Sequence, residues 1–412
     1  MAGSIQVMPE EASCEGPAGE GDGHVPPPLD AAAPLWRREP YRVLFPLGVV
    51  LGWVGVAKWL LLATAGVGTF SSADHAIAQV QGFMMCFAAG FLLTAIPRRT
   101  ASAPASVGVV VVAALAPTLT TIAAVFERFA WSQAAWLVLV ATLVGFVVRR
   151  LRGGAAARRR PPVAFVWVPL SFLMGLAGSL LMAFRALGPE WRPLHTVGKG
   201  LLVQGMFVGL ILGVGSMVIP LITRGTAPPD ASPRDHLALG GHLLGALLLA
   251  GSFVIEEYVD ARAGLTLRGL IALAVLVAAA GLARRPTTPG LHRWLVWLGA
   301  WCVPLGLLLA AAFPAQRAGA LHVLFLGGFA TLALAVGVHV TLAHAGDERR
   351  LLGRPWPVAA LGVLLVVALA LRLAVSFDPA RLWLWLGASS AAFLLATAAW
   401  AALAAPRLLR EA

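Results

Sequence analysis

Histidine is the side chain in this sequence that most often combines chemical versatility with a place in or beside a long apolar run. The chain has nine histidines, and His24 alone lies in a polar segment remote from such runs. A neutral imidazole is the commonest protein ligand for metal ions, and it also ligates haem iron. The other histidines are therefore the first candidates for a cofactor site.

Depth along the apolar runs divides these histidines into groups. Three share the outer end of a run: His75, His195 and His322. Two lie about 7–9 Å inside the opposite boundary at a rise of 1.5 Å per residue, namely His242 and His339. Three lie at that boundary itself: His236, His292 and His344. Similar depth is what allows residues on different helices to meet, so each end of the bundle is a candidate site.

The outer group predicts that His75 and His322 share one haem or one metal ion. Gln79 lies one helical turn after His75 on the same face, where its amide could orient a ligating imidazole. An interhelical hydrogen bond is an equally good interpretation of Gln79. The chemistry expected here is axial ligation by facing imidazoles.

Two basic residues accompany this outer group. Lys199 follows His195 by one turn on the same face, and it or Arg192 could pair with an anionic substituent such as a haem propionate. The alternatives are that Lys199 snorkels to the membrane surface and that His195 makes only a helix-end hydrogen bond.

The deeper group at the other end predicts a second site formed by His242 and His339, with His344 near its mouth. An unpaired imidazole in hydrocarbon is costly, so each of these residues needs a partner. His339 and His344 are five residues apart, about 140° around an ideal helix, and so do not form a chelating pair on one face.

Long helices must position these residues, because the composition is that of a membrane protein. Of the 412 residues 59% are apolar and 12% charged, with a mean hydropathy of +0.83. A soluble domain carries about 25% charged residues. This excludes an ordinary soluble enzyme. The net charge of +12 does not indicate nucleic-acid binding, since the basic residues lie in short breaks between apolar runs, where they set orientation.

We predict an all-α, polytopic membrane helix bundle with about 12 transmembrane helices. The expected spans are residues 43–65, 75–97, 105–125, 131–149, 163–184, 195–222, 236–256, 265–283, 291–313, 318–344, 356–376 and 382–404. Residues 1–34 form an acidic tail that we expect to be disordered and cytoplasmic, and residues 35–412 form the transmembrane domain. No internal repeat is evident in the sequence.

Charge distribution predicts the orientation. Most of the 31 basic residues fall in alternate breaks, which places both termini in the cytoplasm by the positive-inside rule. The carboxylates, including Glu256 and Glu257, lie at span ends or in loops, which weighs against a carboxylate proton relay across the membrane. The three cysteines show no metal-binding or redox spacing.

Several stretches resemble the NnrS family over nearly the whole chain after the tail. They are Pro40-Tyr41-Arg42, the segment GFLLTAIPR at 90–98, the segment GSMVIPLITR at 215–224 and the segment TLAHAG at 341–346. The resemblance implies a bacterial inner-membrane protein that contains haem, expected to be b-type, and copper. It also implies an association with denitrification and nitric oxide tolerance.

The resemblance also carries over residue by residue. His75 matches the first histidine of the family's H-x-H-E-M stretch, whereas Ile77, Ala78 and Gln79 stand at the positions of its second histidine, glutamate and methionine. In the late span His322 and His344 match the family's two histidines, and His339 stands where arginine is usual. The sequence therefore departs from the family pattern at both places.

The primary interpretation is a multi-pass membrane protein that binds haem and copper and acts in the nitric oxide response by binding, scavenging or electron transfer. Its partners would be the lipid bilayer and nitric oxide or a redox protein. The sequence does not indicate whether the protein turns over a substrate. The alternatives are a secondary transporter of a small solute and a non-catalytic membrane assembly factor. Secondary transporters often have a carboxylate inside the membrane or a pair of interrupted spans in matching halves, and this sequence shows neither feature.

Overall fold

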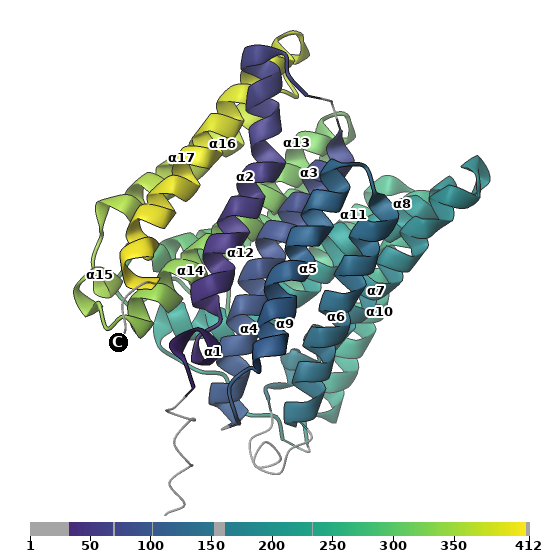
Figure 1. Cartoon of the computed structure of the whole chain (residues 1–412). Helices are drawn as coiled ribbons and strands as arrows, with labels where there is room; N and C mark the ends of the chain where they lie inside the picture. The colour runs from purple at the N-terminus through teal and green to yellow at the C-terminus, as the bar shows by residue number, and fades with distance from the viewer. Residues whose placement is uncertain (1–32, 69–70, 101, 152–160, 233, 409–412) are drawn as a thin grey trace, which may run out of the picture.

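The computed structural model describes residues 33–68, 71–100, 102–151, 161–232 and 234–408 (Figure 1). Within these ranges the chain forms helices and no strands, and twelve helical segments are long and apolar enough to cross a membrane. The prediction of an all-α bundle with about 12 spans is therefore confirmed. The predicted tail lies almost wholly outside the described residues, as does most of the arginine-rich segment that follows Leu151.

The twelve spans fall into three consecutive groups of four. The first group comprises α2 (Tyr41–Ala65), the span Ser72–Thr100 with α3, η1 and α4, then α5 (Val107–Val125) and α6 (Phe129–Leu151). The second comprises the span Val163–Met182 with α7, the span Pro189–Arg224 with α8, η6 and α9, then α10 (His236–Tyr258) and α11 (Ala261–Ala278). The third comprises α12 (Leu291–Ala312), the span Pro314–His344 with α13, η8 and α14, then α16 (Trp356–Ala374) and α17 (Leu382–Leu408).

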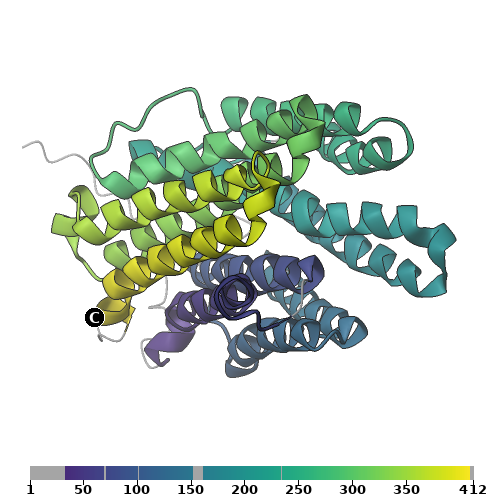
Figure 2. The same ribbon diagram turned by 90° about the horizontal axis from the view of Figure 1, so that it is seen from above.

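Packing repeats from group to group. In each group the first span packs along the second, and the third and fourth spans pack as a pair. Neighbouring groups meet through α6 and α7, through α11 and α12, and through α17 and α2, so the groups close into a ring. Figure 2 shows α17 in yellow beside the purple α2. The sequence did not reveal this threefold repeat.

The second span of each group is the most buried. The buried shares of these three spans are 78%, 83% and 67%, against 50% or less for every other described span. Each also contains a π-helical segment: η1 (Ala78–Met84), η6 (Leu201–Gly205) and η8 (Val323–Ala330). Such segments often mark functional sites, because the wider turn displaces side chains and leaves a backbone carbonyl without its usual partner. These three spans line the middle of the ring.

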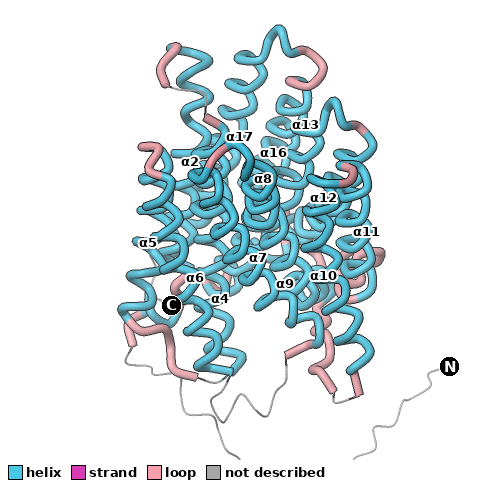
Figure 3. The backbone as a smooth tube through the Cα atoms, turned by 90° about the vertical axis from the view of Figure 1, so that its right-hand side faces the viewer, coloured by secondary structure: helices cyan, strands magenta, loops and turns pink. Residues whose placement is uncertain are grey.

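The two ends of the bundle can now be named. α1 (Leu35–Arg38) and the carboxy-terminal end of α17 lie at one face, which we call the termini face (Figure 1). The loops at the other end, seen again in Figure 3, form the opposite face. His75 and His322 belong to the half of the bundle near the opposite face, since each lies close to the start of a span that begins there.

A close contact between two glycines holds the fifth and sixth spans together. A Cβ atom at Gly178 would lie 2.6 Å from the carbonyl oxygen of Gly198, and one at Gly198 would lie 2.8 Å from the carbonyl oxygen of Gly178. Only glycine permits such an approach of two helix backbones, which is how small residues stabilise helix pairs in lipid. The contact fixes the position of α8 (Arg192–Gly200), which carries Lys199.

We predict that Gly178→Ala lowers the free energy of unfolding by about 1–3 kcal/mol, because the added methyl group meets backbone that cannot rotate away. Unfolding of the purified protein in detergent or bicelles measures the change. Gly251→Ala in α10 is the matched control, since a Cβ there meets nothing within 4 Å. Equal destabilisation by both substitutions would contradict the importance of the contact.

Candidate cofactor site

A cavity of about 440 Å³ opens between the second spans of the three groups in the half of the bundle near the opposite face. Its wall includes apolar side chains such as Val56, Phe253 and Phe393. Its histidine, amide and charged residues are His75, Gln79, Lys199, Gln204, Glu256, Glu257, Arg317, His322 and Arg372. The structure therefore brings His75 and His322 to the wall of one cavity, as their equal depth suggested.

His75 ends the first turns of its span just before η1 and faces α2. Its Nδ1 lies 2.9 Å from the carbonyl oxygen of Gly55 and 3.2 Å from the indole nitrogen of Trp59. One ring nitrogen cannot donate and accept at once, so these two contacts belong to different tautomers. In the tautomer that donates to Gly55, the lone pair is on the second ring nitrogen, Nε2.

His322 ends α13 (Arg317–His322), immediately before η8. Its Nδ1 lies 2.7 Å from the carbonyl oxygen of Ala318, one turn earlier, and donates to it. Its Nε2 accepts a longer hydrogen bond of 3.3 Å from Nε of Arg372 in α16. His322 therefore has the tautomer in which His75 donates to Gly55, with an arginine held against its lone pair.

The two imidazoles are oriented as metal-binding histidines usually are. A ligating histidine donates one ring N–H to a carbonyl or carboxylate and offers the other nitrogen to the metal. At His75 and His322 the backbone carbonyls of Gly55 and Ala318 supply this partner. In this tautomer both side chains can present Nε2 as a ligand.

Three basic side chains line the cavity, together with the carboxylates of Glu256 and Glu257. Lys199, Arg317 and Arg372 line it from three different spans, and Arg317 forms an ion pair with Glu256. The one hydrogen bond described for the side chain of Arg372 is the long one to His322. Such a set of cations suits the carboxylates of an anionic cofactor or ligand.

Behind Glu256 lies an arginine that is fully buried inside the membrane region. Arg268 of α11 donates to Glu256 over 2.6 Å, to Gln204 over 2.7 Å and to Ser252 over 3.0 Å. Its guanidinium also lies 3.5 Å from the centre of the Phe253 ring. These contacts fix one wall of the cavity, because Gln204, Glu256 and Phe253 all line it.

Two predicted neighbours of the histidines have other contacts. The amide of Gln79 donates over 2.7 Å to the carbonyl of Gly52, so it binds α2 instead of the imidazole of His75, although it lines the cavity. His195 binds the carbonyl of Met182 over 3.0 Å and is not among the cavity-lining residues, whereas Lys199 is. The helix-end alternative describes the position of His195.

The structure does not bring His242 and His339 together. His242 accepts a hydrogen bond of 3.1 Å from the indole of Trp167, within the second group of spans. His339 instead contacts His292 of α12, with 3.1 Å between Nδ1 of His339 and Nε2 of His292. The two histidines lie at a similar position along their spans, but α10 directs His242 toward Trp167 and α14 directs His339 toward His292. No group of three or more histidine, cysteine or acidic residues positioned to hold a metal ion occurs within the described ranges.

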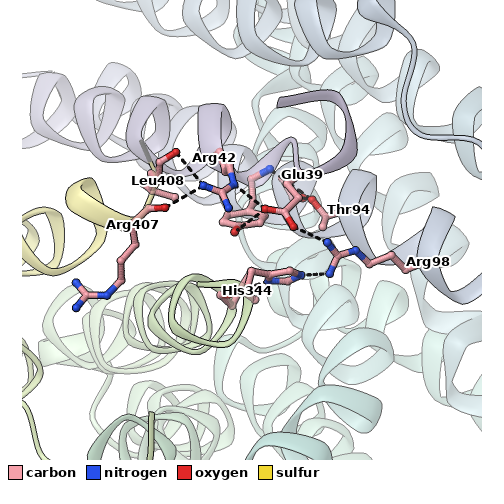
Figure 4. A network of polar contacts seen from close by, with 10 residues as sticks. Glu39, Arg42, Thr94, Arg98, His344, Arg407 and Leu408 are labelled. Atoms are coloured by element: carbon pink, nitrogen blue, oxygen red, sulfur yellow. Dashed lines mark hydrogen bonds and ion pairs between the residues drawn. The ribbon is translucent and has the colours of Figure 1, made fainter. Parts of the chain in front are cut away.

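His344 belongs to a polar network at the termini face (Figure 4). Its Nδ1 binds the carbonyl of Val340 over 2.8 Å, and its Nε2 accepts from Arg98. Arg98 also donates to Glu39 over 2.6 Å, and the second carboxylate oxygen of Glu39 accepts from Arg42 over 2.6 Å. Both ring nitrogens of His344 are therefore engaged within the protein.

The electrostatics of this network are set by the position of Glu39 just outside the first span. Burial alone would raise the pKa of Glu39, but the hydrogen bond from Arg42 and the positive charge around the carboxylate outweigh it and hold the pKa below its ordinary value of 4.5. The carboxylate is therefore ionised at neutral pH.

Comparison of the sequence with known proteins assigns nearly the whole chain to one family. A family model described as NnrS protein matches residues 34–411, nearly the whole chain. The chain belongs to the NnrS family. No curated protein matches it. The two histidines of the late span lie at different places in this chain: His322 lines the cavity, whereas His344 lies in the network at the other face.

Sequence reasoning missed two arginines of this NnrS chain. Arg268 and Arg372 both stand inside apolar spans, and an intramembrane arginine is a functional candidate for the same reason as an intramembrane histidine. The signal was therefore present in the sequence. Glu256 was noted only as a residue at a span end, although its side chain reaches the cavity wall.

We predict that Glu39→Gln lowers the free energy of unfolding by about 3–5 kcal/mol, because the buried guanidinium of Arg42 loses its counter-charge. The depressed pKa adds a pH signature. The carboxylate's contribution is complete above pH 4.5 and is lost as the pH falls through the lower folded-state pKa. Unfolding measured at neutral and at acid pH gives both readouts.

Arg381→Gln is the control for this experiment. Its ion pair with Asp378 spans 3.8 Å at an exposed position, and its loss should cost no more than about 1 kcal/mol. A Glu39→Gln protein as stable as the Arg381→Gln protein would contradict the assigned role of the network.

Proposed function

We propose that this protein binds a b-type haem in the 440 Å³ cavity, where Nε2 of His75 and of His322 would hold the iron, and that it acts in the nitric oxide response. The observation that carries the proposal is the matched orientation of the two imidazoles on one cavity wall, each with Nδ1 on a backbone carbonyl. Bound haem supplies an iron that takes up electrons and binds nitric oxide.

The residues around the cavity fit this group. Ligand pockets are roughly 300–1,000 Å³ and mostly apolar with a few placed polar groups, which describes this cavity. Lys199, Arg317 and Arg372 line the cavity and supply the positive charge that two propionates would need, and the apolar side chains of Phe253 and Phe393 suit the macrocycle. Membership of the NnrS family supports the same group.

The two histidines contribute differently. Nε2 of His322 already accepts from Arg372, whereas the hydrogen bonds of His75 involve Nδ1 alone. We therefore infer that His75 is the firmly held ligand and that His322 is the exchangeable one. If haem is bound, His322 would be the ligand that yields to a gas molecule, and Arg372 would hold its imidazole by the existing hydrogen bond.

Copper is the second metal expected from the family, but fewer residues of this chain are placed to bind it. The pair formed by His292 and His339 is the best local donor set, with two imidazoles in contact inside the bundle. Two imidazole nitrogens without a third protein ligand bind a metal ion less firmly than the larger ligand sets usual in proteins. We assign the function to the haem site.

We predict that the purified, reduced protein shows a b-type haem spectrum. His75→Ala abolishes it, because the firmly held ligand is lost, whereas His322→Ala retains haem with the spectrum of five-coordinate iron. Absorbance spectra and pyridine haemochrome assay measure both. His242→Ala is the matched control, since this histidine binds Trp167 away from the cavity.

Three outcomes would count against this assignment. A colourless protein after haem supplementation favours the alternative of a secondary transporter of a small solute or an assembly factor. Unchanged haem in both His75→Ala and His322→Ala shows that haem binds elsewhere. A change in the spectrum of His339→Ala instead of His75→Ala moves the site to the pair with His292.

The orientation belongs to the same proposal. The first and last described helices, α1 and the end of α17, lie at the termini face. Spans that end at this face carry Arg98, Arg149 and Arg224 in their last turns, and Arg349 follows another. We propose that this face is cytoplasmic in the bacterial inner membrane, which places the haem cavity toward the periplasm.

We predict that reporter fusions at Arg160 and after Ala412 show cytoplasmic activity, because positive loops are retained on that side. Fusion within the loop between α10 and α11, near Asp260, should show periplasmic activity and serves as the internal control. Periplasmic activity at Arg160 or Ala412 would invert the proposed orientation.

A further inference from the structure

A second cavity lies beside the first, farther toward the termini face. It has a volume of about 130 Å³, and its walls come mainly from α4 (Met85–Thr100), α9 (Met206–Arg224) and the end of η8 with α14 (Thr331–His344). Every lining side chain is apolar, and Gly215 adds only backbone. The cavity thus lies among the same three buried spans that hold the histidines.

The wall between the two cavities is thin and made of adaptable side chains. Met84 lines both cavities. Phe325 lines the first and Phe329 the second, with 5.8 Å between their ring centres. Phe207, which also lines the second cavity, lies 5.8 Å from the ring of Phe329. A methionine has several rotatable bonds and fills irregular gaps, so rotation of Met84 is the simplest motion that joins the two spaces.

The chemistry of the walls selects the occupant. A buried water molecule needs two to four polar partners, which apolar side chains do not offer. An engineered apolar cavity of about 150 Å³ in another protein stays dry and binds xenon or benzene. At about 130 Å³ this cavity is of similar size, far too small for an entire lipid acyl chain. A small apolar molecule therefore fits both its volume and its surface.

We propose that this cavity is a binding site for a small uncharged gas molecule, which passes Met84 to reach the histidine-lined cavity. Binding in the apolar cavity stands independently of haem. The passage toward His75 and His322 rests on the proposed function, in which nitric oxide is the gas. The apolar cavity then raises the local gas concentration next to the iron site by holding molecules that dissolve in the surrounding hydrocarbon.

Xenon binding to the purified full-length protein tests the site. Xenon is the probe because it is a spherical apolar atom with a sensitive magnetic resonance signal and strong X-ray scattering. We expect one xenon site in the unaltered protein and its loss in Ala333→Leu, where an isobutyl group fills the cavity from α14. Ala343→Leu is the matched control, since Ala343 lies on the same helix at an exposed position outside the cavity.

The outcomes separate this proposal from the haem proposal. Xenon bound equally by Ala333→Leu and Ala343→Leu, no xenon in the unaltered protein, or a lipid acyl chain found in the cavity would overturn the gas site whether or not haem binds. If the protein carries haem, nitric oxide rebinding after flash photolysis should lose its fast phase in Ala333→Leu and retain it in Ala343→Leu. An unchanged fast phase together with lost xenon would refute the passage past Met84.

Discussion

Hydrocarbon offers no hydrogen-bond partner to a polar group, so each ionisable side chain inside this bundle has to find its partner within the protein. Arg268 shows how far this requirement reaches, since three side chains from the neighbouring spans accept from its guanidinium. The same requirement explains why a buried histidine need not be a ligand. His292 and His339 satisfy each other, and His242 is satisfied by Trp167. What distinguishes His75 is that it lines a cavity and that the hydrogen bonds described for it involve only one of its two ring nitrogens.

The sequence predicted the spans, and it predicted a common depth for His75 and His322, for one physical reason: both depend on position along a helix. Hydropathy marks where a span begins, and a rise of 1.5 Å per residue then fixes the depth of each side chain. His75 and His322 meet at one cavity because equal depth was enough when both spans line the ring's centre. For His242 and His339 depth was also equal, but α10 faces Trp167 in its own group whereas α14 faces α12. Which neighbour a helix faces follows from the order of the spans around the ring, and hydropathy carries no information on that order.

Two further features had weak or no signals in the sequence. The π-helical segments η1, η6 and η8 consist of apolar residues, glycines and, in η1 and η6, glutamines, a composition that local propensity does not separate from α-helix. Residues of all three segments nevertheless line the two cavities. The threefold repeat is a repeat of helix packing, and the three groups of spans show no evident similarity in sequence. Glycine contacts such as that between Gly178 and Gly198 occur where backbones happen to cross, and the many glycines of the chain do not reveal which ones do.

Closure of the ring has a consequence for biosynthesis. Arg42, at the start of the first span, donates to the carbonyls of Arg407 and Leu408, up to 366 residues later in the chain. At synthesis rates of about 5–20 residues per second, the first span waits roughly 20–70 s in the membrane before its last partner arrives. During that interval the cavity also lacks Arg372 and the wall contributed by α17. The cavity is therefore complete only after the last span has entered the membrane, so the nascent chain does not present the same binding surface as the finished protein.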